Sequence, residues 1–269
     1  NTAVYLARSL NRADTPAEVH YVTALGEDPF SEEMLAAWQA EGLQTGQVFR
    51  LPGHLPGLYI IRTDGAGERS FHYWRSAAAA RELLRAERAE TLATGLRGFD
   101  LVYLSGITLG ILDAGSRECL FTLLQRLKQG GSRIAFDTNY RPRLWQNRED
   151  AQVAVARVLG LASLALPTFD DEAALFGDRS PEATAARLHG LGVTEIVVKC
   201  GPEPCLVSLE GSQTRVAGAR VESPLDTTAA GDSFNGAYLA ARLAGATAED
   251  AAAAGHRLAA KVIATKGAI

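Results

Sequence analysis

The sequence is poor in cysteine and histidine, which limits the kinds of site it can form. Its 269 residues include three cysteines, Cys119, Cys200 and Cys205, and five histidines. An odd and sparse set of cysteines is not a disulfide framework, and it indicates the reduced thiols of a cytoplasmic protein. Cys200 and Cys205 lie near each other, but no further Cys or His cluster accompanies them, so we do not expect a zinc site.

The sequence also lacks long apolar runs and blocks of basic residues. No stretch of about 18 apolar residues occurs, so we expect neither a membrane span nor a membrane partner. The formal net charge is −4, and without a basic block a nucleic-acid partner is not expected. A chain of this length can bury the core of one large α/β domain, and residues 1–269 are predicted to form a single domain.

Most of the chain alternates short apolar runs with amphipathic helical patterns, which is the rhythm of an α/β sheet. Strands are predicted at 19–25, 101–104, 133–136, 164–166 and 195–199, with an antiparallel hairpin at 205–209 and 213–216. Helices are predicted at 1–11, 31–41, 79–95, 116–129, 149–160, 171–176, 181–190, 231–244 and 247–264.

Residues 47–75 depart from this rhythm, because strands follow one another there without intervening helices. Short β-type runs at 47–51, 57–63 and 68–75 include a hairpin turn at 64–67. Bunched strands do not belong in a doubly wound sheet, so we expect a small β lid over the site, although the pattern alone favours an ordinary surface hairpin. A lid of this kind exposes strand edges and apolar faces, which predicts a homodimer paired through its lids.

Polar segments follow three of the predicted strands. They are residues 137–145, 168–172 and 199–204. Ligands of open α/β sheets bind outside the carboxyl ends of the strands. We therefore expect these segments to converge on one rim of the sheet, together with Asp232, which follows them in the chain.

Residues 226–231 are mostly small and lead through Asp232 into a predicted helix. Small residues before a helix let a ligand approach the backbone closely, and the free N–H groups at the helix start suit an anion such as phosphate. A carboxylate in the first turn stays ionised, because the helix dipole favours its charged form. Spacing alone equally allows a simple helix cap at residues 226–228, with Asp232 as a favourable first-turn charge.

The run D-T-T-A-A-G-D-S-F-N-G at 226–236 resembles the D-T-x-G/A-A-G-D signature of the ribokinase-like PfkB carbohydrate kinases. The resemblance implies a doubly wound, mainly parallel sheet with helices on both faces and a small β lid. It implies Asp232 as general base and the backbone of Ala229, Ala230 and Gly231 as an anion hole for the transferring phosphoryl group. It also implies ATP and Mg²⁺ as cofactors, and it leaves a requirement for K⁺ open.

Further motifs are similar to the sugar-acid branch of this family. They are L-P-G-L-Y-I-I at 55–61, E-R-S-F-H-Y-W-R at 68–75, L-V-Y-L-S-G-I at 101–107, D-T-N-Y-R-P-R-L-W at 137–145 and V-V-K-C-G at 197–201. The branch implies ATP-dependent phosphorylation of 2-keto-3-deoxygluconate to its 6-phosphate. It places Tyr59, Tyr73, Arg75 and Arg141 on the substrate, together with Asp232. Arginine suits a sugar acid, because its fork of donors matches a carboxylate that a neutral sugar lacks.

For the nucleotide, the resemblance implies a second set of residues. It places Asn139, Arg141 and Asp171 near the phosphates, and Lys199, Gly201 and Gly231 along the nucleotide. His256, on the last predicted helix, is expected near the adenine, although a packing histidine is equally consistent with the sequence. No metal ligand is assigned by number.

The sequence departs from the family pattern in three places, one of which is Cys200, where a larger or basic residue is expected. The family usually begins with a strand and a Gly-Gly segment before the helix that is predicted here at 1–11, so we expect this chain to lack that strand and its sugar-contacting glycines. Thr168 stands where the family's N-x-x-E motif has asparagine, whereas Asp171 keeps the acid.

Two other functions stay open at this point. A fructokinase- or ribokinase-like enzyme for a neutral sugar would share the motif at 226–236, and a non-catalytic nucleotide- or sugar-binding module would share the fold. A Rossmann oxidoreductase is disfavoured, because no G-x-G-x-x-G follows the first predicted strand.

Overall fold

A six-stranded sheet forms the centre of the computed structural model, which describes residues 1–63, 69–218 and 221–269. The strand order is β10-β9-β8-β7-β6-β5; the neighbours from β5 to β8 pair in parallel, and the β8–β9 and β9–β10 pairs are antiparallel. The bounds are β5 Leu101–Ser105, β6 Arg133–Asp137, β7 Leu164–Ala165, β8 Glu195–Cys200, β9 Glu203–Leu209 and β10 Ser212–Val216. The prediction of a mainly parallel sheet ending in a hairpin is confirmed.

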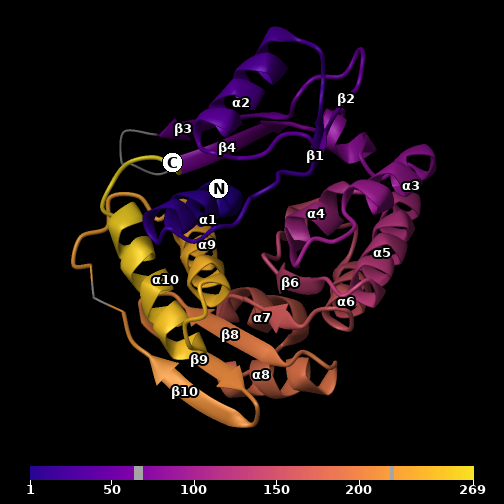
Figure 1. Ribbon diagram of the computed structural model, residues 1–269. Coiled ribbons are helices and arrows are strands. Elements are labelled where there is room, and N and C mark those ends of the chain that lie inside the picture. Colours follow the sequence, from indigo (N-terminus) through magenta and orange to yellow (C-terminus); the bar gives the residue numbers. More distant parts are fainter. Residues whose placement is uncertain (64–68, 219–220) are drawn as a thin grey trace.

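Helices cover both faces of this sheet (Figure 1). One face has α1 Thr2–Arg12, α9 Ala230–Leu243 and α10 Ala248–Val262, with α9 packed between the other two. The opposite face has α3 Ala86–Gly95, α4 Gly106–Ile111, α5 Ala114–Gln129, α6 Arg148–Leu159, α7 Phe169–Phe176 and α8 Pro181–Gly190. The doubly wound arrangement is thereby confirmed.

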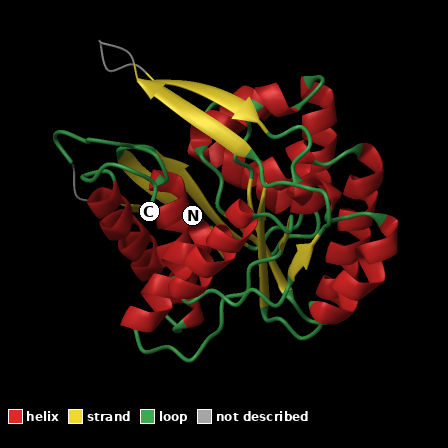
Figure 2. Cartoon of the chain, turned by 90° about the horizontal axis from the view of Figure 1, so that it is seen from above, coloured by secondary structure: helices red, strands yellow, loops and turns green. Residues whose placement is uncertain are grey.

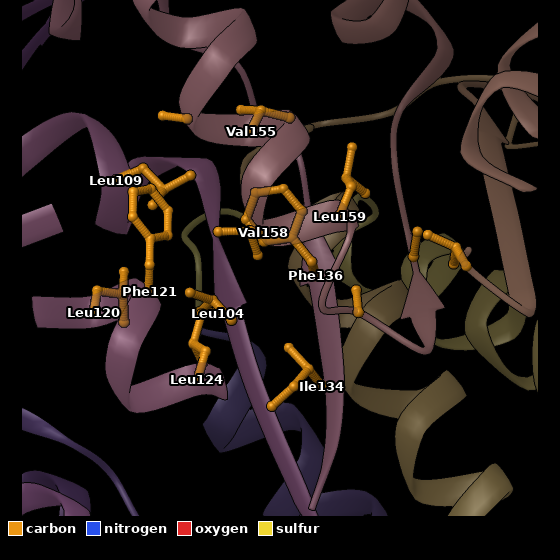
Figure 3. Packing of buried hydrophobic residues seen from close by; sticks show 14 of the residues in the cluster. Leu104, Leu109, Leu120, Phe121, Leu124, Ile134, Phe136, Val155, Val158 and Leu159 are labelled. Atoms are coloured by element: carbon orange, nitrogen blue, oxygen red, sulfur yellow. The ribbon is translucent and has the colours of Figure 1, made fainter. Parts of the chain in front are cut away.

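Alternation along the strands explains the two helical layers. In β6, Ile134 and Phe136 belong to the core cluster under α5 and α6, whereas Ala135 belongs to the cluster under α1, α9 and α10. Successive side chains of a strand point to opposite faces, so a continuous apolar run buries both. Figure 3 shows the first of these clusters, with its labelled residues Leu104, Leu109, Leu120, Phe121, Leu124, Ile134, Phe136, Val155, Val158 and Leu159.

Side-chain caps fix where several helices begin. Asp113, Asn147, Ser180 and Thr247 each accept a hydrogen bond from the backbone N–H three residues later, at the starts of α5, α6, α8 and α10. These caps satisfy N–H groups that helix geometry leaves without partners. Helix α9 has no side-chain cap, as is also the case for α1, α3, α4 and α7.

Two small strand pairs lie outside the six-stranded sheet. β1 Thr23–Leu25 pairs in parallel with β2 Val48–Arg50, and β3 Leu58–Thr63 pairs antiparallel with β4 Arg69–Trp74. The prediction grouped β2 with the hairpin, but a turn at Gly46 and Gln47 sets β2 against β1 instead. The same turn limits the first strand, predicted at 19–25, to a single bridge at His20 and three paired residues. Figure 2 shows the β3–β4 hairpin as a separate two-stranded arm.

The helix predicted at 79–95 is split in two. A 3₁₀ turn at Ala79–Glu82 is separated from α3 because Arg85, the residue before α3, has an extended backbone. Its guanidinium group binds the Glu82 carboxylate, which fixes this break.

Helix α2, Pro29–Ala40, begins at the Asp28 cap, close to its predicted place. The turn predicted at 64–67 lies outside the described residues. In the part of the chain that is described, no helix is long and apolar enough to cross a membrane.

Candidate active site

The carboxyl ends of the parallel strands bring the predicted polar segments together. The backbone N–H of Lys199, in β8, donates to the Pro167 carbonyl oxygen after β7 at 2.8 Å. The Lys199 ammonium group lies 3.0 Å from Asp137 Oδ2, at the end of β6. The same nitrogen is 3.6 Å from the position that a Cβ on Gly231 would take. The three segments and the start of α9 therefore meet at one rim of the sheet.

The backbone at the start of α9 is shaped to receive an anion. Ala229 has a left-handed conformation (φ 62°), which is unusual for a residue with a Cβ, and it immediately precedes the helix. Asp226 holds the preceding loop, since its Oδ1 accepts from the Thr228 N–H at 2.9 Å and its Oδ2 from the Gly267 N–H at 3.0 Å. The Ala230 N–H donates to the Thr227 carbonyl oxygen at 3.2 Å. With no side-chain cap, the next N–H groups of the first turn and the helix dipole can face a phosphate oxygen.

Asp232 lies in this first turn, and both its oxygens are held by the start of α1. Asn1 Nδ2 donates to Asp232 Oδ2 at 2.8 Å, and Thr2 Oγ1 donates to Oδ1 at 3.1 Å. The close approach of α1 to α9 depends on Gly236, because a Cβ there would lie 2.7 Å from Tyr5 Cβ. The carboxylate is half-buried, so it can be both oriented by the protein and reached by a substrate.

A buried polar cluster lies directly behind the rim. Lys199, Asp137 and Asn235 are at most 7% exposed. Lys199 Nζ donates to Asp137 Oδ2 and to Asn235 Oδ1, each at 3.0 Å, and Asn235 Nδ2 donates to Asp137 Oδ2 at 2.8 Å. The Lys199 ammonium group is thus committed to two neighbours in the core. That lysine was expected along the nucleotide, and the structure places its charge beneath Gly231.

The loop after β6 brings Arg141 to the rim, where it meets an acid from the start of α7. Arg141 pairs with Asp171, in the first turn of α7, with Nη1 and Oδ1 3.3 Å apart. Burial raises the pKa of Asp171, and the Arg141 charge offsets only part of this effect. Asn139 has a φ of 35°, and its buried Oδ1 has no hydrogen-bond partner among the described residues. An acceptor without a partner at this position fits a bound group that donates or a cation.

Three of the predicted substrate residues lie on one face of the hairpin. Tyr59 is directly opposite Tyr73, with ring centroids 6.0 Å apart. The Arg75 guanidinium carbon lies 4.1 Å from the centre of the Tyr73 ring. Residues at even spacing share a face of a strand, so these side chains form one surface. Arg141 pairs with Asp171, and its contact with the substrate stays a prediction.

Gly201 and His256 have separate local roles. Gly201 has a left-handed backbone (φ 59°) in the tight turn between β8 and β9, which glycine adopts without strain. His256 Nε2 donates to the Val216 carbonyl oxygen at 3.0 Å, and its ring packs edge-on against Phe234. Burial lowers the pKa of His256. The imidazole is therefore a packing group against the end of β10, and its expected place near adenine stays a prediction.

The donors at the rim suit a nucleotide phosphate with a hydrated cation. Within the described residues, no group of three or more His, Cys, Asp or Glu could hold a metal ion. Mg²⁺ usually keeps several waters and binds through phosphates and one or two carboxylates, so it does not need such a group. Asp171 and the unpartnered Asn139 Oδ1 are the oxygens that fit this pattern.

Sequence reasoning missed residues that contact the candidate base and its support. Asn1 and Thr2 occur in a stretch that was interpreted only as an amphipathic helix. Tyr103 and Asn235 are inside motifs that were quoted, but nothing in their spacing singled them out. Asn235 Nδ2 donates to the Tyr103 hydroxyl at 3.1 Å, which lies 3.4 Å from Thr2 Oγ1. The signal that could have found Asn235 is its position three residues after Asp232, on the same side of the helix.

The start of α9, with a carboxylate in its first turn, and the Arg141–Asp171 pair at the rim supply groups that phosphoryl transfer can use. The chain belongs to the pfkB family of carbohydrate kinases, whose pattern matches residues 1–269. The predicted family, fold and enzyme class are thereby confirmed.

Relatives of known name agree with this placement. The chain is 47% identical over 272 residues to a 2-dehydro-3-deoxygluconokinase of Dickeya dadantii, covering 100% of this chain and 87% of the relative. The crystal structure of a PfkB protein from Polaromonas matches with a TM-score of 0.86 at 25% identity, over 98% of this chain and 83% of that chain. A fructokinase from Vibrio cholerae, solved with fructose, ADP and calcium ion, matches with a TM-score of 0.83 at 25% identity, over 100% and 85%.

Proposed function

We propose that this protein transfers the terminal phosphoryl group of ATP to 2-keto-3-deoxygluconate (2-dehydro-3-deoxygluconate), giving the 6-phosphate. The observation that carries the proposal is the placement of Asp232 in the first turn of the uncapped helix α9, with both carboxylate oxygens held. The 47% identity to a kinase named for this sugar acid supports the substrate.

In the proposed reaction, the oxygen of the sugar hydroxyl attacks the γ-phosphorus atom, Asp232 accepts the hydroxyl proton, and the bond from the γ-phosphorus to the bridging oxygen breaks to release ADP. An ionised carboxylate is a weak base, which is sufficient when the proton leaves late, after the new P–O bond has begun to form. The backbone of Ala229, Ala230 and Gly231 faces the transferring group and stabilises the negative charge that spreads over its oxygens. The protein thus contributes positioning and electrostatics more than covalent chemistry.

We propose ATP with Mg²⁺ as the second substrate. Mg²⁺ neutralises charge on the nucleotide phosphates when bound. Asp171 and Asn139 supply oxygens toward it or its waters, and Arg141 binds phosphate from the position fixed by its ion pair with Asp171. Potassium has no support in the comparisons, and we do not extend the proposal to it.

The hairpin face is proposed to recognise the sugar acid. Arg75 offers paired N–H donors to the substrate carboxylate, and the Tyr73 ring beneath it limits the directions in which the guanidinium can point. Tyr59, opposite Tyr73, adds a phenolic hydroxyl for the sugar. Fructose and ribose lack the carboxylate, so this face distinguishes the sugar acid from a neutral sugar.

The test is ADP release from ATP and Mg²⁺ with the sugar acid present, in wild type and in Asp232→Asn. We expect turnover that falls by about 100- to 10,000-fold in the variant, the range for loss of a general base. The matched control is Asp250→Asn, an exposed first-turn acid of the neighbouring helix α10, and it should retain wild-type turnover. Binding of ATP without turnover in the wild type would instead support a binding module.

We also propose a homodimer through the other face of the hairpin. Leu58, Ile60 and Trp74 lie there and are 56%, 50% and 59% exposed. An apolar strip of this kind on a two-stranded arm is costly in water and favours pairing with a second copy. Sedimentation equilibrium should give a dimer for the wild type and a monomer for Ile60→Glu. A wild-type monomer at concentrations on the order of micromolar would contradict the proposal.

The proposed cellular compartment is the cytoplasm. Its support is that Cys119, Cys200 and Cys205 are free thiols, as expected of a reducing compartment. Cell fractionation with an antibody against the protein tests it, and a signal outside the cytoplasm would refute it.

A further inference from the structure

A continuous chain of polar contacts connects the buried cluster behind the rim to Asp232. From Asn235 it continues through the Tyr103 hydroxyl to Thr2 Oγ1, and from there to Asp232 Oδ1, with distances of 3.1, 3.4 and 3.1 Å. The groups come from β5, α1 and α9. Together with Asp137 of β6 and Lys199 of β8, the chain links five separate elements behind the carboxylate.

The chemistry of the groups fixes the direction of each hydrogen bond. An ammonium group only donates, so Lys199 must face the carbonyl oxygen of Asn235. The amide nitrogen of Asn235 then has two hydrogens, of which one goes to Asp137 Oδ2 and the other to the Tyr103 oxygen. Every polar atom of the Asn235 side chain is thereby used, and its amide cannot rotate without losing three bonds.

The same reasoning gives the direction of the hydrogen bonds between Tyr103, Thr2 and Asp232. Thr2 Oγ1 carries one hydrogen and lies within reach of both the Tyr103 oxygen, at 3.4 Å, and Asp232 Oδ1, at 3.1 Å. Because Tyr103 already accepts from Asn235, its own hydrogen can point at Thr2 Oγ1 when Thr2 donates to the carboxylate. Thr2 accepts there and gives its single hydrogen to the Asp232 carboxylate, which can only accept. The buried lysine therefore fixes the orientation of a series of hydrogen bonds, which ends with the Thr2 hydroxyl donating to Asp232.

Stability alone is a poor explanation for this cluster. Removing two opposite charges from water costs free energy that their attraction often fails to recover, and apolar replacements of buried pairs are frequently as stable. The neighbouring strand positions are apolar, with Ile196, Val197 and Val198 fully buried beside Lys199. A charged residue in that run calls for a role that an apolar side chain would not provide, and orientation of Asn235 is such a role.

We propose that Thr2 and Tyr103 are positioning residues for the phosphoryl-transfer step, and that the Lys199–Asp137–Asn235 cluster fixes their orientation. The inference rests on the proposed role of Asp232 as base. Hydrogen bonds that orient a metal-binding side chain from behind contribute about 10- to 100-fold to activity, and we take the same range for a carboxylate base. The cluster thus holds one carboxylate oxygen by donation, which restricts the directions from which the base can accept the sugar proton.

The test compares variants that remove one hydroxyl and little else. Thr2→Val keeps the shape of the side chain, and Tyr103→Phe keeps the buried ring. We expect kcat to fall about 10- to 100-fold in each, with KM for the sugar acid and the Kd for ATP within about twofold of wild type. Thr2→Ser restores a hydroxyl at the same position, and we expect it to recover most of the lost kcat.

Tyr238→Phe is the control for loss of a buried hydroxyl from the same helix layer. Its hydroxyl donates to Glu195, away from the rim, so its kcat should remain that of the wild type even if the protein unfolds at a lower temperature. Equal kcat in wild type, Thr2→Val and Tyr103→Phe would overturn the inference. Because Asp232→Asn is measured in parallel, a failure of the base assignment is seen separately, as retained turnover in that variant.

Discussion

The Lys199 ammonium group and the Asp137 carboxylate lie 3.0 Å apart in the core, with side chains that are 9% and 3% exposed. Asp137 ends β6, and Lys199 lies near the end of β8. Strand β7 separates these two strands in the sheet. Their opposite charges offset each other beneath the start of α9, where the helix dipole still favours an anion. Because the Lys199 ammonium group is already paired, it supports the site from below and does not itself bind a phosphate.

Breaking this pair should be costly for folding. Lys199→Met leaves Asp137 buried without its cation, and we expect a loss of about 3 to 5 kcal/mol in the free energy of unfolding. Urea denaturation followed by tryptophan fluorescence measures it. Lys128→Met, on the exposed surface of α5, should change the free energy by less than about 0.5 kcal/mol. A similar small effect for both variants would refute the assignment of a buried ion pair.

Removing Arg75 should affect the sugar acid selectively. A hydrogen bond to a charged group is worth about 1.5 to 3 kcal/mol, which corresponds to roughly a 10- to 150-fold loss in kcat/KM. We expect Arg75→Ala to show this loss with 2-keto-3-deoxygluconate, whereas Arg97→Ala, an exposed arginine after α3, behaves as wild type. An undiminished kcat/KM on the sugar acid would assign the carboxylate to another group.

Asp171 should limit stability at neutral pH. Because burial raises its pKa in the folded state, the folded protein binds this proton more tightly than the unfolded chain does. Between the unfolded pKa of 3.8 and the higher folded pKa, loss of the proton therefore lowers the free energy of unfolding. The whole of this loss is present above the folded pKa.

Asp171→Asn is expected to unfold at higher urea than wild type at pH 7, and the gain should narrow toward pH 4.5. Asp170→Asn, its exposed neighbour in the same helix turn, should show no such gain. If Asp171→Asn were less stable at pH 7, the ion pair with Arg141 would outweigh the burial of the carboxylate.

Gly236 should control the spacing of α1 and α9. A Cβ at Gly236 would lie 2.7 Å from Tyr5 Cβ and 2.8 Å from the Leu6 backbone nitrogen, so α1 must shift. We expect Gly236→Ala to lose about 1 to 3 kcal/mol of stability and also kcat, because Asn1 and Thr2 move with α1. Gly190→Ala, with nothing within 4 Å of the new Cβ, should fold and react normally. Full activity of Gly236→Ala would show that the register of α1 does not matter.

Much of the fold could be predicted because its signals are local. The apolar runs of β6 and β8 and the helical patterns at 116–129 and 149–160 depend on a few neighbouring residues. The pairing of β2 with β1 was missed, since it depends on a turn at Gly46 and Gln47 and on contacts between distant segments. The break before α3 was missed for the same reason, because the extended backbone at Arg85 accompanies an ion pair with Asp113 from α5.

The site residues also differ in whether a local stretch of sequence identifies them. The motif at 226–236 is contiguous, so the residues that we propose as base and anion hole stand out in the sequence itself. The contacts of Thr2 and Tyr103 join residues about one hundred or more positions apart, and no spacing rule reports them. The burial of Lys199 was also invisible, because a lysine after an apolar strand has the same sequence pattern whether its ammonium points outward or into the core.

The most direct test of the central claim is a comparison of kcat/KM for 2-keto-3-deoxygluconate, fructose and ribose, measured by ADP release with ATP and Mg²⁺. The account predicts that the sugar acid is preferred by at least about 10-fold, the lower bound set by one charge-assisted contact. Equal or higher kcat/KM on fructose or ribose would contradict the sugar-acid assignment and favour a kinase for neutral sugars.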